Sequence, residues 1–190
     1  MAEPGGNEGH FGLSEGDKNQ LLRIAKTTIE RRARGLEPPS FQVTSEILNR
    51  KLGVFVTIRK GEALRGCIGF IQGLKPLFQA VGEMATAAAF QDPRFPPVSS
   101  EELTSLKVEI SVLTPLHKVG EVFEIEVGDH GIYIIREAYA GLLLPQVATE
   151  NGWDRTTFLQ QTCLKAGLPP DAWQEPQTEI YIFSADIFSE

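Results

Sequence analysis

The amino-acid sequence predicts an α+β fold built from two similar ββα units. Apolar runs on both sides of Lys60-Gly61-Glu62 indicate a β-hairpin over about residues 54–71. A second pair of apolar runs, over about residues 131–145, also indicates a β-hairpin. A helical pattern follows each of the two hairpins. With 190 residues, of which 42% are hydrophobic, the chain can bury a core of ordinary size, in one domain or in two small lobes.

A weak internal repeat relates the two hairpins. Gly53-Val54-Phe55-Val56 and Gly131-Ile132-Tyr133-Ile134 both open a hairpin, at an offset of 78 residues (131 minus 53), which also aligns Leu64 with Leu142. The repeated units would span about residues 53–90 and 131–167. A hairpin followed by a helix is also a common arrangement, so the pattern fits either a duplication or a chance recurrence.

The first half of the chain begins with a tail and a long helix. Residues 1–12 are polar and glycine-rich, which predicts a flexible tail. Ser14, with Asp17 three positions later, is typical of a helix N-terminus, and apolar residues follow at helical spacing until Gly35. A short helical piece over residues 45–51 leads into the first hairpin.

Proline positions organise the segment after the first hairpin. Pro76 is suited to the start of a helix, and the alanine-rich stretch Leu77–Phe90 predicts one. Three prolines within residues 91–97 exclude a helix there, so we expect an ordered or extended loop. Residues 99–103 can form a single turn, and the alternation over residues 108–112 predicts a half-buried strand.

The second half of the chain is predicted to form short strands and one more helix. Residues 122–127 and 132–135 predict strands, and the chain turns again before Leu142–Pro145. A loop precedes a helix capped by Asp154, which we expect over residues 155–166. A single last strand is expected over residues 178–187.

The hexapeptide Leu64–Gly69, in the second strand of the first hairpin, is the main candidate for a functional site. Strict alternation places Arg65, Cys67 and Gly69 on one face. A nearby cation makes a cysteine thiolate more available as a nucleophile. Glycine inside a strand, as at Gly66 and Gly69, usually marks a close approach by a ligand or by another backbone. The spacing therefore permits a reactive or ligand-contacting thiol without demonstrating one.

Composition disfavours several classes of protein. The net charge of −7 and the pI of about 5.1 argue against binding to nucleic acid, because such proteins usually carry a basic stripe. We expect no membrane segment, since no apolar run approaches the roughly 18 residues that a span requires. Two separated cysteines and three scattered histidines predict neither a disulfide framework nor a metal site. We therefore expect a cytoplasmic protein without a metal or other cofactor.

The hexapeptide and three later segments together resemble the AMMECR domain family, whose microbial representatives are called AmmeMemoRadiSam system protein A. The later segments are Ala89–Pro97, the Val127–Gly131 turn and Leu143–Ala148, and the likeness extends over about residues 14–188. The family motif maps onto Arg65, Gly66, Cys67, Gly69, Asp92, Arg94, Phe95, Pro96, His130, Gly131 and Pro145.

The resemblance carries further expectations. It implies a cytoplasmic AMMECR-type domain over residues 13–190, with an antiparallel, strongly curved, barrel-like sheet, helices outside, and two lobes that meet at a cleft. It implies as partners a Memo-like protein and a radical SAM enzyme, whose genes often accompany those of the family. No established reaction comes with it, and the oligomeric state is not predicted.

Each candidate residue has a functional and a structural interpretation. Cys67 is a candidate nucleophile with His130 as its base, or it fills a tight packing site. Arg65 binds a small anionic ligand, or it is locked to a carboxylate such as Asp92 or Glu109. His130 in turn can simply bond the backbone of its own turn.

The loop that follows the alanine-rich helix has the same two interpretations. Asp92 and Arg94 bind a ligand together, or they orient each other. With Gly66 and Gly69, they complete the set of candidate ligand contacts.

Three functions remain open from the sequence. The first is an enzyme, or a subunit of one, that acts on a small substrate in the cleft with Cys67. The second is a non-catalytic accessory protein that docks a Memo-like or radical SAM partner. The third is a nucleic-acid-associated regulatory module, which the negative charge disfavours. We favour a site-bearing component of a multi-protein pathway.

Overall fold

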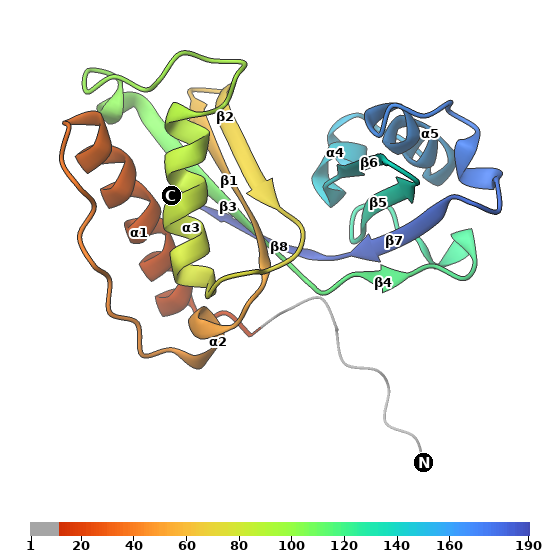
Figure 1. Cartoon of the computed structure of the whole chain (residues 1–190), viewed down its shortest axis with the longest axis horizontal. Helices are drawn as coiled ribbons and strands as arrows, with labels where there is room; N and C mark the ends of the chain where they lie inside the picture. The colour runs from red at the N-terminus through yellow and green to blue at the C-terminus, as the bar shows by residue number, and fades with distance from the viewer. Residues whose placement is uncertain (1–11) are drawn as a thin grey trace. The chain divides into compact units, whose positions relative to one another are not determined.

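The computed structural model describes residues 12–190 and divides into two compact units (Figure 1). Unit 1 runs to Leu113 and also includes Asp186–Glu190, and unit 2 comprises Thr114–Ala185. The chain therefore enters unit 2 once and returns to unit 1 once. Of the tail predicted over residues 1–12, all but Gly12 lies outside the described residues.

Unit 1 is a four-stranded sheet with two long helices on one of its faces (Figure 1). The sheet order is β2-β1-β3-β8, and β1 pairs antiparallel with both β2 and β3. Its elements are α1 (Glu15–Ala33), α2 (Glu46–Asn49), β1 (Gly53–Lys60), β2 (Ala63–Phe70), α3 (Leu77–Phe90), the short 3₁₀ helix η1 (Leu103–Ser105), β3 (Leu106–Leu113) and β8 (Ala185–Ser189).

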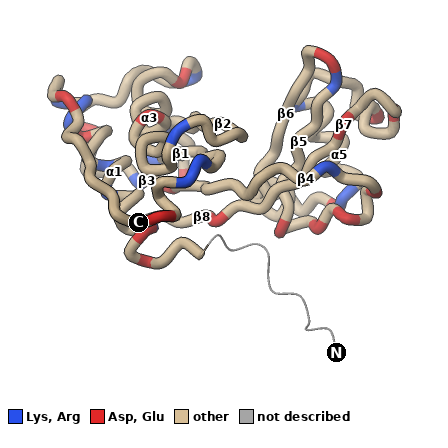
Figure 2. Tube along the Cα trace, turned by 60° about the horizontal axis from the view of Figure 1, so that its bottom comes forward, with Lys and Arg blue, Asp and Glu red and all other residues tan. Residues whose placement is uncertain are grey.

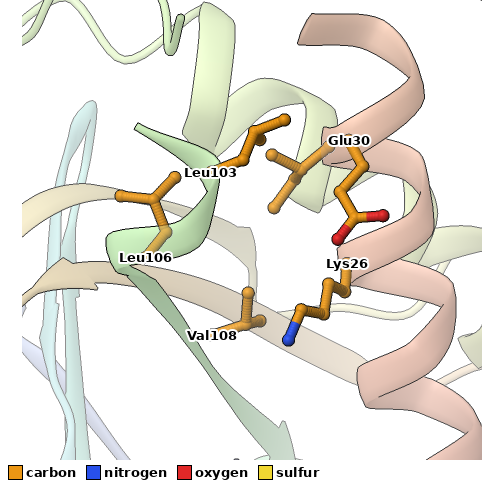
Figure 3. Close-up of a pocket in the computed structure, with 6 residues that line it drawn as sticks. Lys26, Glu30, Leu103, Leu106 and Val108 are labelled. Atoms are coloured by element: carbon orange, nitrogen blue, oxygen red, sulfur yellow. The ribbon is translucent and has the colours of Figure 1, made fainter. Parts of the chain in front are cut away.

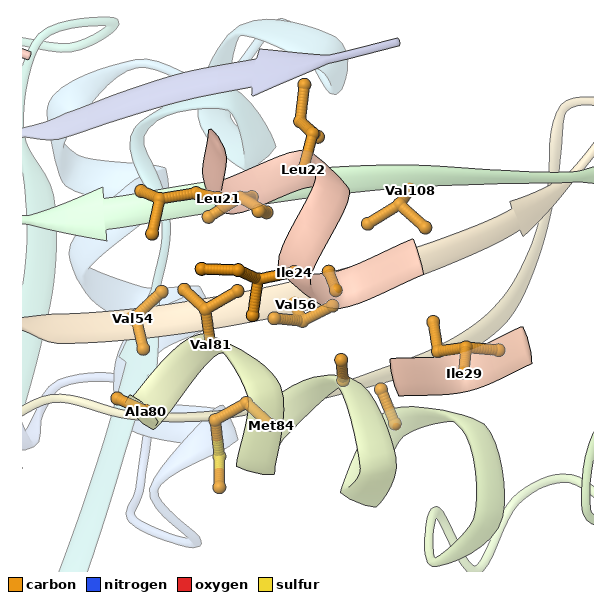
Figure 4. Packing of buried hydrophobic residues seen from close by; sticks show 14 of the residues in the cluster. Leu21, Leu22, Ile24, Ile29, Val54, Val56, Ala80, Val81, Met84 and Val108 are labelled. Carbon is orange, nitrogen blue, oxygen red and sulfur yellow. The ribbon is translucent and has the colours of Figure 1, made fainter. Parts of the chain in front are cut away.

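Local signals explain the two long helices. The Ser14 side chain accepts from the Asp17 backbone N–H while the Asp17 side chain accepts from the Ser14 backbone, so α1 begins with a complete capping box. Helix α3 begins directly after Pro76, as predicted. Both helices place apolar side chains against one face of the sheet, where Val54, Val56 and Ile58 of β1 are fully buried. Figure 4 shows this core between α1, α3 and the sheet.

A glycine in β2 lets the sheet and α3 touch directly. A Cβ atom on Gly66 would lie 2.1 Å from the backbone oxygen of Ala88, far inside any real contact distance. Gly66 therefore brings the last turn of α3 onto the edge strand β2. The loop that follows α3 must start beside this strand.

Unit 2 is a second four-stranded sheet, in the order β4-β7-β5-β6. Ile132, Ile134, Ile180 and Ile182 of the sheet pack with the apolar face of α5, which includes Phe158. The elements are β4 (His117–Lys118), the 3₁₀ helix η2 (Val122–Glu124), β5 (Gly131–Arg136), β6 (Tyr139–Leu143), α4 (Pro145–Glu150), α5 (Arg155–Lys165), the 3₁₀ helix η3 (Ala172–Gln174) and β7 (Glu179–Phe183).

The mixed helix and antiparallel-sheet class is confirmed, but the barrel-like sheet is wrong. Each sheet is open, with edge strands β2 and β8 in unit 1 and β4 and β6 in unit 2. Hairpins β1–β2 and β5–β6 are each followed by helix, yet the origin of the two ββα units by duplication stays a prediction.

Two predictions about local structure after residue 120 were wrong. Residues 122–127 contain a 3₁₀ turn instead of a strand, because the Glu124 carboxylate accepts from the Glu121 backbone N–H and caps the turn. The last strand is two strands, β7 and β8, which belong to different sheets. The short helix that begins at Pro145 was not predicted.

Among residues 12–190, no helix has the length and hydropathy to cross a bilayer.

The contact at Gly66 makes a stability prediction. Gly66→Ala should lower the free energy of unfolding by more than about 2 kcal/mol, because the new methyl group overlaps the backbone of α3. The control is Gly16→Ala in α1, where the nearest atom to a Cβ lies at 3.6 Å, and which should change stability by less than about 1 kcal/mol. Urea unfolding of both variants measures this. Equal effects would contradict the packing at β2.

Candidate functional site

The backbone of Cys67 is bound on its open side by two side chains from the loop after α3. The Cys67 N–H donates to Asp92 Oδ2 at 2.9 Å, and Arg94 Nη2 donates to the Cys67 carbonyl at 3.2 Å. Cys67 lies on an edge strand, so these two groups point away from β1 and would otherwise face solvent. We call this pair of residues the Asp92–Arg94 clamp.

The two residues of the clamp also hold each other. Arg94 Nε donates to Asp92 Oδ1 at 2.9 Å, and Arg94 Nη2 donates to Asp92 Oδ2 at 2.7 Å. The Asp92 side chain is 1% exposed, whereas that of Arg94 is 52% exposed. The hydrogen bond from Arg94, with that from the Cys67 N–H, holds the pKa of Asp92 far below its usual range. The clamp is therefore charged at neutral pH.

Arg65 forms a second ion pair beside the clamp. Its Nε and Nη2 each donate to one carboxylate oxygen of Glu102, both at 3.0 Å. Arg65 sits where the register between β1 and β2 shifts, so it has no partner residue on β1 and its side chain leaves the regular alternation. The structural interpretation of Arg65, a pairing with a carboxylate, is present, but the partner is Glu102 instead of Asp92 or Glu109, the two examples named from the sequence.

The hydrogen bond from Arg65, with one from the Ser99 backbone N–H, lowers the pKa of Glu102 to about 2. Both guanidinium groups of the site lie against the ring of Phe95, at 6.0 Å for Arg65 and 5.6 Å for Arg94. Phe95 thereby joins the two ion pairs. Arg65 Nη1 is buried and has no hydrogen-bond partner in the part of the chain that the structure describes.

The thiol of Cys67 is half-buried and contacts one polar side chain. The Thr57 hydroxyl donates to Cys67 Sγ at 3.3 Å, across the directly paired positions of β1 and β2. The side chains are close because this pair uses no backbone hydrogen bonds between the two strands, the Cys67 N–H being bound to Asp92. Register within the hairpin could have identified Thr57, but no sequence signal identified Glu102.

The structure brings Arg65, Cys67, Asp92 and Arg94 together. The other candidate residues, Gly66, Gly69 and His130, make contacts that explain their presence without a ligand. A Cβ atom on Gly69 would lie 2.4 Å from the Phe55 ring, so both glycines of the hexapeptide permit close packing within unit 1. His130 belongs to unit 2, where its Nδ1 accepts from the Glu126 backbone N–H at 3.1 Å. Its pairing with Cys67 stays a prediction.

The described residues offer no metal site, and the cavity beside α1 and β3 is too small for a ligand. Residues 12–190 hold no cluster of three His, Cys, Asp or Glu side chains arranged to bind a metal ion. A cavity beside Lys26 and Leu106 measures about 10 Å³ and has room for little more than one water molecule (Figure 3). Cys163 is a fully buried core residue, as predicted, and burial raises the pKa of its thiol.

The chain is similar in sequence and in fold to known proteins of one family. The sequence model of the AMMECR1 family matches residues 22–188. Protein TK0174 of Thermococcus kodakarensis is 49% identical over 183 residues, covering 90% of this chain and 88% of that protein. Protein NEQ441 of Nanoarchaeum equitans is 46% identical and covers 90% and 98%. The crystal structure of the uncharacterized protein PH0010 from Pyrococcus horikoshii superposes with a TM-score of 0.84 at 44% identity, covering 90% of this chain and 89% of that one.

The Arg65–Glu102 pair predicts a pH-dependent stability. Glu102 has a pKa of about 2 when folded and an ordinary value of 4.5, so its contribution is complete above pH 5 and is lost as the pH falls toward 2. Glu102→Gln should therefore cost about 2–3 kcal/mol of unfolding free energy at pH 7 and almost nothing near pH 2.

Urea unfolding across this pH range measures the effect. Glu101→Gln is the matched control, because the neighbouring Glu101 is exposed and none of the ion pairs within residues 12–190 involves it. A penalty for Glu102→Gln that did not shrink in acid would contradict the assignment.

Proposed function

The chain belongs to the AMMECR1 family, and we propose that it binds a small anionic ligand beside β2 of unit 1, with the Cys67 thiol presented to that ligand. The observation that carries this proposal is the Asp92–Arg94 clamp, which fixes both backbone polar groups of one half-exposed cysteine. A thiol held in this way keeps one position relative to whatever binds next to it.

Unused hydrogen-bond donors support an anionic ligand. Arg65 donates to Glu102 through Nε and Nη2, and Arg94 donates to Asp92 through the same two groups. Neither Nη1 group has a hydrogen-bond partner among residues 12–190. The Arg94 side chain is 52% exposed, so its Nη1 is open to an acceptor such as a carboxylate or phosphate oxygen, whereas Arg65 Nη1 is buried and Arg65 contributes its positive charge. Phe95 lies against both guanidinium groups and supplies an apolar surface between them.

The proposed roles follow from these contacts. Arg65 and Arg94 bind the anion, Asp92 orients Arg94, and Cys67 is the nucleophile or a direct ligand contact. The Thr57 hydroxyl, which donates to Sγ, holds the thiol in place. His130 is the proposed base of a catalytic version of this function; because Nδ1 accepts from the Glu126 N–H, the neutral ring carries its proton on Nε2, and the base role requires Nδ1 to be released from that hydrogen bond.

We further propose that this site serves a pathway that includes a Memo-like protein and a radical SAM enzyme, on the strength of the family resemblance. The accessory alternative keeps the same partners and gives the chain a docking role alone. A nucleic-acid partner is disfavoured, since unit 2 carries 4 of the 18 Lys and Arg residues but 10 of the 25 Asp and Glu residues (Figure 2).

Alkylation tests the thiol. In the folded chain, Cys67 should react with iodoacetamide at least about 100-fold faster than Cys163, because Cys163 is fully buried and its thiol pKa is raised. Inorganic phosphate should slow the reaction of Cys67 if an anion binds beside it. Mass spectrometry of the labelled peptides separates the two sites.

Two variants sharpen this experiment. Arg94→Ala removes one proposed anion contact and should abolish protection by phosphate, while Lys75→Ala, an exposed cation elsewhere in unit 1, should leave protection unchanged. Slow labelling of Cys67 at the rate of Cys163 would remove the thiol from the proposal.

Co-purification separates the two pathway roles. If the chain acts only by docking, a complex with a Memo-like partner should survive Cys67→Ser and Arg94→Ala without a change in affinity. Loss of the complex in these variants, with circular dichroism unchanged, would contradict pure docking and would place the partner's contact at the clamp.

A further inference from the structure

We propose that the anion bound beside β2 is the C-terminal carboxylate of an extended peptide, which pairs with the edge of β2 at Gly69. This inference rests on the function proposed above, because it uses the guanidinium of Arg94, and it adds the class of ligand. Two observations support it. The edge strand has free backbone groups at Gly69, and an exposed cation lies where an added strand would have to end.

The backbone polar groups of Gly69 point away from β1. In an antiparallel pair of strands, opposite residues alternate between those that exchange backbone hydrogen bonds and those that do not. Cys67 and Thr57 form a pair of the second kind, since the Cys67 N–H donates to a side chain outside the sheet. Two residues further along β2, Gly69 and Phe55 are opposite each other and therefore form another. Because β2 is an edge strand, the N–H and C=O of Gly69 face outward.

These two groups of Gly69 have no partner in the part of the chain that the structure describes. Among residues 12–190, no side chain and no turn forms a hydrogen bond with the Gly69 backbone, whereas the clamp binds both outward groups of Cys67. Gly69 is half-buried, and a Cβ atom on it would lie 2.4 Å from the Phe55 ring, so this ring covers the face of the strand and leaves its edge open. Free edge groups of this kind form the hydrogen bonds of an added strand.

The clamp limits how far an added strand can extend along β2. Asp92 and Arg94 occupy the outward groups of Cys67, so a strand that pairs with Gly69 meets the Arg94 side chain at the next outward position. A ligand that ends there avoids this obstacle. The last residue of a peptide that runs antiparallel to β2 donates its N–H to the Gly69 carbonyl and directs its carboxylate to the Gly69 N–H and to Arg94.

The exposed charge at this position suits a carboxylate. The Arg94 side chain is 52% exposed, whereas that of Asp92, which holds it, is 1% exposed, so the surface presents the cation and hides the anion. Nε and Nη2 of Arg94 bind within the clamp, and Nη1 has no partner among residues 12–190. A carboxylate accepts from a guanidinium and from a backbone N–H together, and a peptide that ends in an amide lacks this charge-assisted bond.

Nuclear magnetic resonance of the full chain tests the proposal with three matched probes. Acetyl-trialanine with a free carboxylate should shift the Gly69 N–H resonance saturably, and it should bind at least about tenfold more tightly than its C-terminal amide or acetate ion. The amide lacks the charge, and acetate lacks the backbone groups. Equal binding of the acid and the amide, or an unchanged Gly69 resonance, would overturn the peptide C-terminus as the ligand.

Variants locate the carboxylate. Arg94→Ala should abolish the preference for the acid over the amide, while Lys75→Ala, an exposed cation elsewhere in unit 1, should retain it in full. Arg94→Lys, which keeps the charge, should retain part of it. A preference that survived in Arg94→Ala would refute the site, and if Arg94→Ala fails to fold, the three probes on the unaltered chain still decide.

The same titrations separate this inference from the function on which it rests. If inorganic phosphate protects Cys67 from iodoacetamide but the acid peptide binds no more tightly than acetate, the anion site stands and the peptide ligand is wrong. If neither phosphate nor the peptide affects Cys67 or Gly69, both proposals are wrong.

Discussion

The Asp92–Arg94 clamp satisfies a physical constraint on which the arrangement of unit 1 depends. An edge strand has backbone N–H and C=O groups that face away from its neighbour, and these groups need partners. At Cys67 one carboxylate and one guanidinium supply both. The clamp thus replaces a neighbouring strand over one residue, and it ties the loop after α3 to the middle of β2. The same two bonds position the cysteine and order the loop.

The clamp in turn depends on glycine. Gly66 lets the backbone of Ala88 approach β2, so α3 ends beside the strand and Asp92 follows only two residues after Phe90. The loop is closed by a hydrogen bond from the Val98 N–H to the Ala89 carbonyl. The close contact between Ala88 and Gly66, together with the hydrogen bonds of Asp92 and Arg94 to Cys67, joins the hexapeptide to the loop after α3. The two segments therefore form one structural unit although a helix separates them in the sequence.

Local chemistry made most of the fold of unit 1 predictable, while the site depended on distant contacts. The caps at Ser14 and Pro76 define α1 and α3 through neighbouring residues alone. The pair Arg65–Glu102 joins residues 37 positions apart and requires a shift of register between β1 and β2, which alternation does not reveal. Likewise, no periodicity separates β7 from β8, because their division reflects which sheet each strand joins.

The two hairpins differ at the position that matters for the clamp. Gly141 in β6 packs against Ala166 as Gly66 packs against Ala88, so both units use glycine to bring a helix end onto the second strand. The offset of 78 residues that aligns Gly53 with Gly131 aligns Cys67 with Pro145, however, and Pro145 begins a helix. Proline has neither a thiol nor a backbone N–H that a carboxylate could bind. Whatever the origin of the two units, the backbone chemistry of the clamp is therefore possible in only one of these two aligned positions, which is the one in unit 1.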